Sequence, residues 1–525
     1  MIQILIGAAT SGSGKTTFTI GLLRALSRRG LRVQPFKCGP DYIDTQFHGI
    51  AAGRQSVNLD TWMASPDHIR EVFARYCADA DVAVIEGVMG LFDGYDRMRG
   101  SSAEIAALLD VPVLLVVNAR STAYSVAALL HGFRTFRPDV RIAGVVFNQV
   151  ASESHYTFLR DAAADAGVPS LGWIPRAEGI EVPSRHLGLT IGMEQEINAL
   201  ADRAADLIEH IGDGSLCVTS ALFRELFGVS VSETTDLSGP IPPTPFGRGP
   251  LPFTSPRAAM VSDTDSPKSS VQPESLTRGE PSPMCSVTRG EPSPMCFAVA
   301  RDRAFNFAYR ENLDRLAEMG QVVYFSPLAG DELPQNVDMI YLPGGYPELF
   351  APQLALNRML ASQLVQYAEG GGRILAECGG MMYLGKSLTD QDGKVWPMAG
   401  VLPIECTMQG ARLHLGYRRM TIGSTEFRGH EFHYSKIDAK GSFLSVASLC
   451  ESVPSGRANN ASKGSFLSVA SLGESVPSGR ASFASLQFDA RGEKVDTELF
   501  RYKNVIAGYT HWYWGESDIN AFWEL

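Results

Sequence analysis

Short apolar runs alternate with amphipathic segments from the first residues of the chain onward. Ile2 to Ala8 is apolar at almost every position and predicts a buried strand, whereas apolar residues recur at helical spacing from Thr17 to Arg29. A repeated alternation of strands and helices predicts an α/β fold with a doubly wound parallel sheet over residues 1–225. The further segments of this domain are strands expected at residues 31–36, 81–85, 111–117 and 142–147 and a helix from Thr122 to Phe133.

Regular patterning resumes at residue 297 and continues to the C-terminus. A helix is expected from Tyr309 to Met319, where apolar residues again recur at helical spacing. We therefore expect a second α/β domain over residues 297–525. Its apolar runs predict strands at residues 297–300, 322–325, 339–342 and 373–376.

The segment between the two domains, residues 226–296, is rich in proline, serine and threonine. Within it Thr277 to Cys285 recurs without change as Thr288 to Cys296, and this period fits no common solenoid repeat. Such a composition buries too little apolar surface to offset the entropy of ordering. We interpret the segment as a linker that contains an inserted repeat.

A second duplication lies inside the C-terminal domain. Residues Lys440 to Ala458 recur as Lys463 to Ala481 with a single difference between the copies. We interpret residues 440–482 as a surface insertion. Neither insertion is expected to take part in catalysis, and partner binding is the alternative.

A glycine-rich turn, Ala9-Thr-Ser-Gly-Ser-Gly-Lys-Thr16, joins the first predicted strand to the first predicted helix. Such a turn directs backbone N–H groups and the positive end of a helix at phosphate, while its lysine reaches the outer phosphates and its threonine reaches magnesium. The pattern departs from the usual one at Ala9, where glycine is common. A chance Gly-Lys-Thr is the alternative, but the context favours an ATP site built from Gly12, Ser13, Gly14, Lys15, Thr16 and Thr17.

Carboxylates follow two of the predicted strands. The loop Lys37-Cys-Gly-Pro-Asp41-Tyr-Ile-Asp44 follows the second strand, and its two aspartates either serve the nucleotide edge or cap the next helix. Glu86 ends the third strand and precedes the glycine-containing run Gly87-Val-Met-Gly-Leu-Phe-Asp93. An acid at this position suits a magnesium nucleotide site opposite Thr16, whereas a strand-terminal surface Glu is the alternative.

The fifth predicted strand ends at Asn148, whose side-chain amide can hydrogen-bond the edge of adenine. An ordinary turn asparagine is an equally good interpretation. Because the C-terminal ends of parallel strands meet at the ligand-binding edge of such a sheet, we include Asn148 among the expected ATP contacts.

The second domain has a cysteine on a glycine-flanked turn. The strand predicted at residues 373–376 runs into Cys378-Gly-Gly380 and then a short helix, which places the thiol at a helix N-terminus, where a thiolate is stabilised. Gly345, after the preceding strand, and Gly379 can direct N–H groups at a developing oxyanion. A nucleophilic cysteine also needs a base, and His511 is the candidate.

The alternative interpretation makes Cys378 a packing residue and His511 a structural histidine. His414, His430 and His433 compete with His511 for the role of base. The last two lie in Arg428-Gly-His-Glu-Phe-His433-Tyr-Ser435, which is too polar to be expected in the core, so we assign it to binding or interdomain contact. A zinc site in this segment lacks a convincing further ligand at the usual spacing.

Charge and composition exclude several classes of protein. The formal net charge of -11 lacks the basic excess expected of a nucleic-acid-binding protein. Met1 leads directly into the first strand and no apolar run reaches the roughly 18 residues of a membrane span, so we expect a cytoplasmic protein. Eight cysteines without a CxxC pair favour reduced thiols over a disulfide framework. The oligomeric state stays open, with a homodimer as one option.

These motifs, taken in order, resemble the cobyrinic acid a,c-diamide synthases, glutamine amidotransferases of cobalamin biosynthesis. The resemblance covers almost the whole chain apart from the two repeat-bearing segments. It implies a P-loop domain like that of dethiobiotin synthetase, joined to a class I glutamine amidotransferase domain that uses Cys and His without the usual Glu. The matching stretches are Ser11 to Thr16, Lys37 to Asp44, Glu86 to Gly94, Gly344 to Glu348, Ala376 to Gly380 and Arg428 to His433.

The resemblance also implies a reaction and its participants. ATP would phosphorylate the a and c acetate carboxylates of a corrinoid, and ammonia from L-glutamine would attack the acyl phosphates. Thr16 and Glu86 are then the expected Mg²⁺ ligands, with Asp41 nearby. Cys378 would form a thioester with glutamine, and His511 would be its base. The remaining carboxylates, Asp44 and Asp93, are expected to position the macrocycle or the incoming ammonia.

Two alternatives remain at this stage. The same diamidation of hydrogenobyrinate or nickel sirohydrochlorin would use nearly the same motifs. A partitioning-type P-loop ATPase would be a binding switch and would have no use for Cys378 and His511. Such ATPases also carry an additional lysine early in the loop, where this chain has Thr10 and Ser11.

Overall fold

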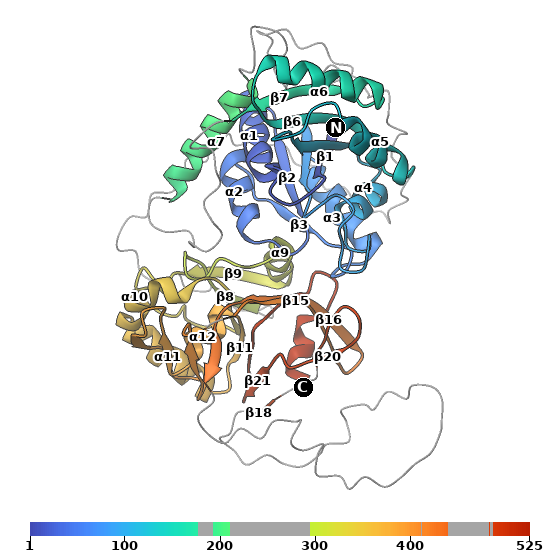
Figure 1. Cartoon of the computed structure of the whole chain (residues 1–525). Helices are drawn as coiled ribbons and strands as arrows, with labels where there is room; N and C mark the ends of the chain where they lie inside the picture. The colour runs from blue at the N-terminus through green and yellow to red at the C-terminus, as the bar shows by residue number, and fades with distance from the viewer. Residues whose placement is uncertain (177–192, 210–294, 411, 439–481, 484–486, 525) are drawn as a thin grey trace, which may run out of the picture.

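The structure is a computed structural model that describes residues 1–176, 193–209, 295–410, 412–438, 482–483 and 487–524. Figure 1 shows two lobes in contact, the N-terminal one in blue to green and the C-terminal one in yellow to red. The predicted end of the first domain at residue 225, the linker and the C-terminal repeats lie outside the described residues, apart from Met295, Cys296 and Ser482.

The N-terminal lobe contains a seven-stranded sheet in the order β3-β2-β4-β1-β5-β6-β7, and all neighbouring strands are parallel. The strands are β1 (Ile2–Ala8), β2 (Val33–Cys38), β3 (Val57–Leu59), β4 (Val82–Glu86), β5 (Val113–Asn118), β6 (Ile142–Val150) and β7 (Ser170–Pro175). The helices are α1 (Lys15–Arg28), α2 (Ile43–Ala52), α3 (Pro66–Cys77), α4 (Ser102–Leu109), α5 (Val126–Phe136), α6 (Glu153–Asp165) and α7 (Met193–Glu209). The predicted doubly wound α/β sheet is confirmed.

Helices cover both faces of this sheet, which explains why its strands are apolar at successive positions. In β1, Ile4 and Ile6 belong to one apolar cluster and Leu5 belongs to the other. Successive side chains of a strand point to opposite faces, so both faces need apolar residues.

The C-terminal lobe also contains a seven-stranded sheet, in the order β18-β21-β22-β11-β10-β8-β9. Its β9 to β22 part is parallel, and β21 and β18 are antiparallel to their neighbours. The strands are β8 (Met295–Ala300), β9 (Gly320–Phe325), β10 (Met339–Leu342), β11 (Arg373–Glu377), β18 (Ser482–Phe483), β21 (Leu499–Tyr502) and β22 (Val505–Gly508). The helices are α9 (Arg310–Met319), η2 (Pro347–Phe350), α10 (Ala351–Leu356), α11 (Arg358–Glu369), α12 (Gly379–Leu384) and η4 (Ile519–Glu524). Strand β8 begins at Met295, so the last two residues of the predicted linker belong to this strand.

Two smaller sheets complete this lobe, one antiparallel and one mixed. The five-stranded one, in the order β20-β19-β15-β16-β23, consists of β15 (His414–Ile422), β16 (Thr425–His433), β19 (Gln487–Phe488), β20 (Lys494–Val495) and β23 (Thr510–Tyr513). The four-stranded one consists of β12 (Ser387–Thr389), β13 (Val395–Pro397), β14 (Glu405–Thr407) and β17 (Lys436–Asp438). The polar segment Arg428 to Ser435 forms most of β16, and its Glu431 and His433 are buried. The prediction that this segment is too polar for the core is wrong, because Glu431 pairs with Arg418 and with His433 inside the fold.

The two lobes pack directly on one another. Tyr417 Oη donates to Asp60 Oδ2 at 2.7 Å, and Arg428 Nη1 donates to the carbonyl O of Trp62 at 2.8 Å. The interdomain role predicted for the polar segment is therefore confirmed for Arg428. The apolar cluster of the N-terminal lobe also includes three aromatic residues of the C-terminal lobe, Phe307, Tyr309 and Tyr513.

The cysteines divide into two groups. Free thiols occur at Cys38, Cys77, Cys378 and Cys406, whereas Cys296 is in a disulfide whose partner lies outside the described residues. The expectation of reduced thiols is wrong for Cys296, because spacing along the chain does not determine which thiols meet in space. Across the described ranges, every helix is too short or too polar to cross a membrane.

Candidate active site

The phosphate loop connects β1 to α1 and is held from β6. Gly14 has a φ of 92°, and a Cβ there would lie 2.1 Å from Asn148 Nδ2, so only glycine fits. Asn148 Nδ2 donates to the carbonyl O of Ser13 at 3.0 Å, and its Oδ1 accepts from Gln149 N at 2.9 Å. Asn148 also lines a recess together with Thr17. Its contact with adenine stays a prediction, and its observed role is to hold the loop.

The loop after β4 lies against the phosphate loop. Lys15 is buried, and its Nζ donates to the carbonyl O of Met89 at 2.5 Å. Asp93 lies further along the same loop, is exposed, and accepts a hydrogen bond from Gly90 N at 3.0 Å. The predicted phosphate lysine and the predicted substrate aspartate therefore border the same loop.

A buried polar cluster brings together residues from α1, β2, α2 and β4. Thr16 Oγ1 donates to Glu86 Oε1 at 2.7 Å and lies 3.5 Å from Asp44 Oδ2. Lys37 Nζ lies 2.6 Å from Asp44 Oδ2 and 2.8 Å from Glu86 Oε1. His48 Nε2 lies 2.6 Å from the other oxygen of Glu86. Apart from Thr16, which is half-buried, these side chains are almost completely buried.

The charges of this cluster stabilise one another. Burial alone would raise the pKa of Glu86, but Lys37 and His48 outweigh it and lower that pKa well below its usual value. Burial alone would also lower the pKa of Lys37, but Asp44 and Glu86 raise it above its usual value. Glu86 is therefore a carboxylate and Lys37 an ammonium at neutral pH.

The oxygens of Thr16, Asp44 and Glu86 converge on one small volume, which fits a hard divalent cation such as Mg²⁺. The ammonium of Lys37 lies among the same oxygens. Asp41, a predicted ligand, instead has Oδ1 at the N-terminus of α2, where it accepts from Ile43 N and Asp44 N, both at 2.9 Å. Its part in metal binding stays a prediction.

Lys37 and His48 are additional site residues that the sequence-based assignment misses. A signal exists for Lys37, which is the only charged residue in the fully buried strand β2. His48 lies four residues after Asp44 on α2, so the two share one face of the helix.

Cys378 lies at the junction between β11 and α12 in a backbone conformation that is rare for a side chain, with φ 47° and ψ -105°. Its N–H donates to the carbonyl O of Gly508 at 2.7 Å, and its Sγ lies 3.9 Å from the carbonyl O of Phe432. Burial and the nearby Glu348 raise the pKa of the thiol. The predicted strand-to-helix turn is thus present, and the thiol is protonated until a base acts on it.

The glycines around Cys378 are required by close packing. A Cβ at Gly380 would lie 2.1 Å from the carbonyl O of Leu342. A Cβ at Gly379 would lie 3.0 Å from the backbone N of Gly345. The two predicted oxyanion residues, Gly345 and Gly379, are therefore neighbours although they follow different strands.

His511 lies on β23, directly opposite His430 on β16. A Cβ at Gly344 would lie 2.1 Å from His511 Cε1, so the turn at residues 344–345 contacts both His511 and Gly379. In the described part of the chain no hydrogen bond joins His511 to Cys378. Burial and the neighbouring His430 lower the pKa of His511 to about 3, which keeps the imidazole neutral.

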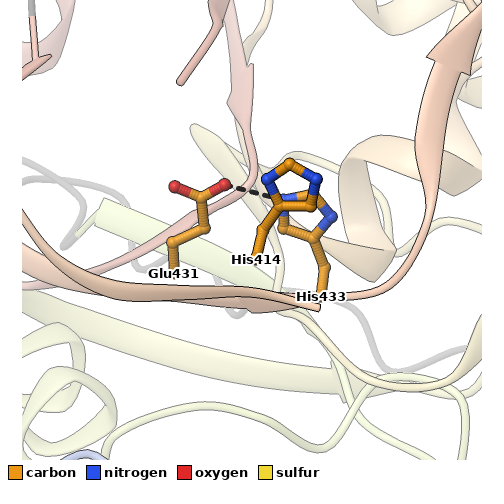
Figure 2. Close-up of side chains that lie close together, drawn as sticks. All are labelled: His414, Glu431 and His433. Carbon is orange, nitrogen blue, oxygen red and sulfur yellow. Dashed lines mark hydrogen bonds and ion pairs between the residues drawn. The ribbon is translucent and has the colours of Figure 1, made fainter. Parts of the chain in front are cut away.

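His414, Glu431 and His433 form a compact cluster in which one candidate ligand atom from each lies within 4.8 Å of the others (Figure 2). His433 Nδ1 lies 2.9 Å from the carbonyl O of Ser435, and its Nε2 lies 2.7 Å from Glu431 Oε1. Glu431 Oε2 accepts from Arg418 Nε at 2.5 Å. Burial would raise the pKa of Glu431, but His433 and Arg418 lower it to about 2. Both ring nitrogens of His433 thus face hydrogen-bond acceptors.

Spacing within residues 428–435 gives no further zinc ligand, but the fold adds His414, which faces His433 across the β15–β16 pair. The geometry of the two histidine rings nevertheless favours this hydrogen-bonded cluster over a metal centre. The rings of His414 and His433 are stacked at 5° with centroids 4.8 Å apart. Imidazole lone pairs lie in the plane of the ring, so two parallel stacked rings do not direct them at one shared ion.

A P-loop domain and an α/β domain with a cysteine on a strand-to-helix turn define a class of protein, and comparisons with known proteins agree. Residues 4–189 match the CobQ/CobB/MinD/ParA nucleotide binding domain. Residues 297–466 match the CobB/CobQ-like glutamine amidotransferase domain. The protein is therefore a glutamine amidotransferase fused to a nucleotide-binding domain.

Relatives over most of the chain specify the family. The hydrogenobyrinate a,c-diamide synthase of Streptomyces coelicolor is 39% identical over 83% of this chain and 87% of its own length. The cobyrinate a,c-diamide synthase of Priestia megaterium is 32% identical over 98% of this chain and 94% of its own length. The chain belongs to the cobyrinate and hydrogenobyrinate a,c-diamide synthase family and is a glutamine-dependent amidating ligase, which confirms the predicted resemblance.

Among solved structures, chloroplast FtsY from Physcomitrella patens aligns with a TM-score of 0.25 and 16% identity over 38% of this chain and 64% of that chain. A similarity this weak carries no argument about the fold or the activity.

Proposed function

We propose that the protein amidates the a and c acetate carboxylates of a corrinoid, cobyrinate or hydrogenobyrinate, with ATP as the activating substrate and L-glutamine as the nitrogen donor. The printed activities of the relatives support this substrate class. Each amidation needs a carboxylate made electrophilic and an ammonia kept unprotonated. The two lobes meet these needs separately.

The N-terminal lobe would transfer the terminal phosphoryl group of ATP to the substrate carboxylate. The carboxylate oxygen forms a bond to phosphorus, the bond to the ADP oxygen breaks, and an acyl phosphate results. Lys15 would bind the transferred phosphoryl group. Thr16 and Glu86 would hold Mg²⁺, with Asp41 as a further candidate, and Asp44 would position the substrate or the incoming ammonia. When bound, Mg²⁺ neutralises charge that develops on the phosphates. Asp93, which is exposed on the adjoining loop, would position the macrocycle.

The C-terminal lobe would release ammonia from glutamine. His511 takes the proton of Cys378, the sulfur bonds to the amide carbon, and the N–H groups of Gly345 and Gly379 stabilise the oxyanion. The same proton then leaves with the amide nitrogen as ammonia, and water hydrolyses the thioester to glutamate and the free thiol. Ammonia attacks the acyl phosphate, and inorganic phosphate departs.

One contact carries this proposal. The ring of His511 packs against that of Tyr42 with centroids 4.9 Å apart, and Tyr42 lies at the start of α2, between Asp41 and Asp44. The glutaminase histidine is therefore adjacent to the segment of the nucleotide lobe that carries two of the proposed site carboxylates. A fused pair of active sites that exchange an intermediate requires such proximity.

The test is a reconstituted reaction. Purified protein receives ATP, Mg²⁺ and glutamine labelled with ¹⁵N in the side-chain amide, together with cobyrinate, hydrogenobyrinate or nickel sirohydrochlorin. We expect a doubly labelled diamide from one of the corrinoids, detected by mass spectrometry. A diamide only from nickel sirohydrochlorin, or no ATP-dependent product, would reject the proposed substrate class.

A further inference from the structure

A row of three side chains crosses the antiparallel sheet at the boundary between the lobes. Tyr417 on β15 lies opposite His430 on β16, and His430 lies opposite His511 on β23. Directly opposed residues of an antiparallel pair project from the same face of the sheet. Tyr417 and His430 are in edge-to-face contact, with ring centroids 5.6 Å apart.

Both ends of this row contact the nucleotide lobe. Tyr417 Oη donates to Asp60 Oδ2 at 2.7 Å, and the ring of His511 packs against Tyr42. His430, in the middle, is close enough to Asp41 for that carboxylate to influence its pKa. His430 therefore lies beside the glutaminase histidine, at the boundary with the nucleotide lobe.

His430 and His511 each have an unsatisfied nitrogen. Both side chains are more than nine-tenths buried, and the Nδ1 atom of each has no hydrogen-bond partner among the described residues. A buried polar atom without a partner costs about 1–3 kcal/mol. Two such atoms lie on neighbouring strands at the domain boundary, and a polar ligand there would satisfy both of them.

The chemistry of the row identifies the ligand. Burial and the Arg418 charge lower the pKa of His430 to about 4, so its imidazole is neutral at physiological pH. A neutral imidazole nitrogen accepts a hydrogen bond from N–H, and it does not protonate the donor. Ammonia is a small N–H donor that must stay unprotonated to act as a nucleophile, and it fits this requirement.

We propose that His430 is a positioning residue that accepts a hydrogen bond from the ammonia released beside His511 and directs it toward the loop of Asp41 to Asp44. This inference rests on the proposed function. No covalent bond changes at His430, because ammonia enters and leaves the contact as neutral NH₃.

The experiment measures coupling in the full-length protein. His430→Leu removes the acceptor at similar volume, and we expect glutamine hydrolysis within about threefold of wild type while glutamate released per amide formed rises about tenfold or more. Amidation supported by ammonium salt should persist. His430→Gln, which restores an acceptor, should recover part of the coupling.

Tyr417→Phe is the matched control, because it removes the hydrogen bond to Asp60 but retains the imidazole of His430. We expect it to stay coupled, and equal uncoupling in this variant would assign the effect to domain docking and overturn the proposal. Unchanged coupling in folded His430→Leu would overturn it as well, as would loss of glutamine hydrolysis itself. If His430→Leu does not fold, His430→Phe is measured by the same criteria.

The two proposals fail in different ways. If wild type forms no ATP-dependent amide from glutamine, the proposed function is wrong. If wild type forms the amide and the His430 variants remain coupled, only the role of His430 is wrong.

Discussion

The ring of Tyr42 packs against the imidazole of His511 at a centroid distance of 4.9 Å, although the two residues lie in different lobes and far apart in sequence. Tyr42 is flanked by Asp41, which caps α2, and lies two residues before Asp44 of the buried polar cluster. A shift of this segment on nucleotide or substrate binding would therefore change the packing of the proposed base. The contact would connect the two proposed active sites directly.

Removal of the Tyr42 ring should affect both stability and glutamine hydrolysis. We expect Tyr42→Ala to lower the free energy of unfolding by about 3–5 kcal/mol, the usual cost of deleting a large buried aromatic side chain, and to slow glutamate release. Tyr42→Phe retains the ring and should change both quantities little. Urea unfolding and a glutaminase assay measure the two effects, and wild-type hydrolysis by folded Tyr42→Ala would disprove the coupling.

Loss of the nucleophile should separate the two sources of nitrogen. Cys378→Ser should abolish glutamine-dependent amidation and leave amidation with a high concentration of ammonium salt, because external ammonia bypasses the thioester. His511→Ala should behave in the same way. Loss of both activities in Cys378→Ser would show that the two lobes do not carry out separate reactions. Full use of glutamine by His511→Ala would show that the base is His430 or His433 instead.

Neutralising Glu86 and neutralising Asp44 should have different effects on amide formation and nucleotide affinity. Glu86→Gln retains the shape of the side chain but removes a charge, so amide formation should slow by about two orders of magnitude or more while glutamine hydrolysis persists in part. Asp44→Asn should impair amide formation more than nucleotide affinity. Nucleotide binding and amide formation are measured side by side. Normal amidation by Glu86→Gln, or an Asp44→Asn defect limited to ATP affinity, would reverse these roles.

Glu377, directly before the nucleophile, should make stability depend on pH. Its Oε1 accepts from Trp512 N at 3.0 Å and its Oε2 accepts from Tyr341 Oη at 2.7 Å. Burial raises its pKa from 4.5 to about 8, so between these values the unfolded chain loses the proton that the folded chain keeps. This group therefore destabilises the fold increasingly as the pH rises through that window.

Glu377→Gln removes this titration. Its amide oxygen can accept from Trp512 N, and its NH₂ group can donate to Tyr341 Oη once that hydroxyl rotates to accept. We expect its melting temperature relative to wild type to increase between about pH 5 and about pH 8, with the largest gain at the upper end. A difference that does not change with pH would show that Glu377 is ionised in the fold.

The repeat-bearing segments should be dispensable. Because Met295 and Cys296 belong to β8, the copy to delete is one full period, Thr277 to Val287, which leaves the strand intact. This deletion, and removal of Lys463 to Ala481, should leave amidation within about threefold, since a change in loop length has a small entropic cost. Loss of activity in soluble protein would assign these segments a function.

Several strands could be predicted from composition. β1 and β10 have the bounds that the apolar runs predict, because a parallel strand covered on both faces needs apolar residues at successive positions. The pattern does not predict the three-residue strand β3 or the β15–β16 hairpin. Strand β16 reads Thr-Glu-Phe-Arg-Gly-His-Glu-Phe-His, and its buried charges are stable only because partners such as Arg418 come from neighbouring segments.

The parts of the candidate site that lie within a few consecutive residues could be predicted from the sequence. The phosphate loop and the cysteine turn are such parts, because their glycines and reactive side chains are neighbours in the chain. Lys37 and His48 were missed because each acquires its role only beside Glu86, which is distant in sequence.

The sequence by itself determined the two α/β domains, the phosphate loop and the cysteine turn, because continuous apolar runs and short glycine motifs encode backbone conformation over a few residues. Only the tertiary structure decided which side chains meet. Strand order in the first sheet brings Thr16, Lys37 and Glu86 together, and docking of the lobes brings Tyr42 to His511. These contacts depend on packing between segments far apart in the chain, and no local pattern carries that information.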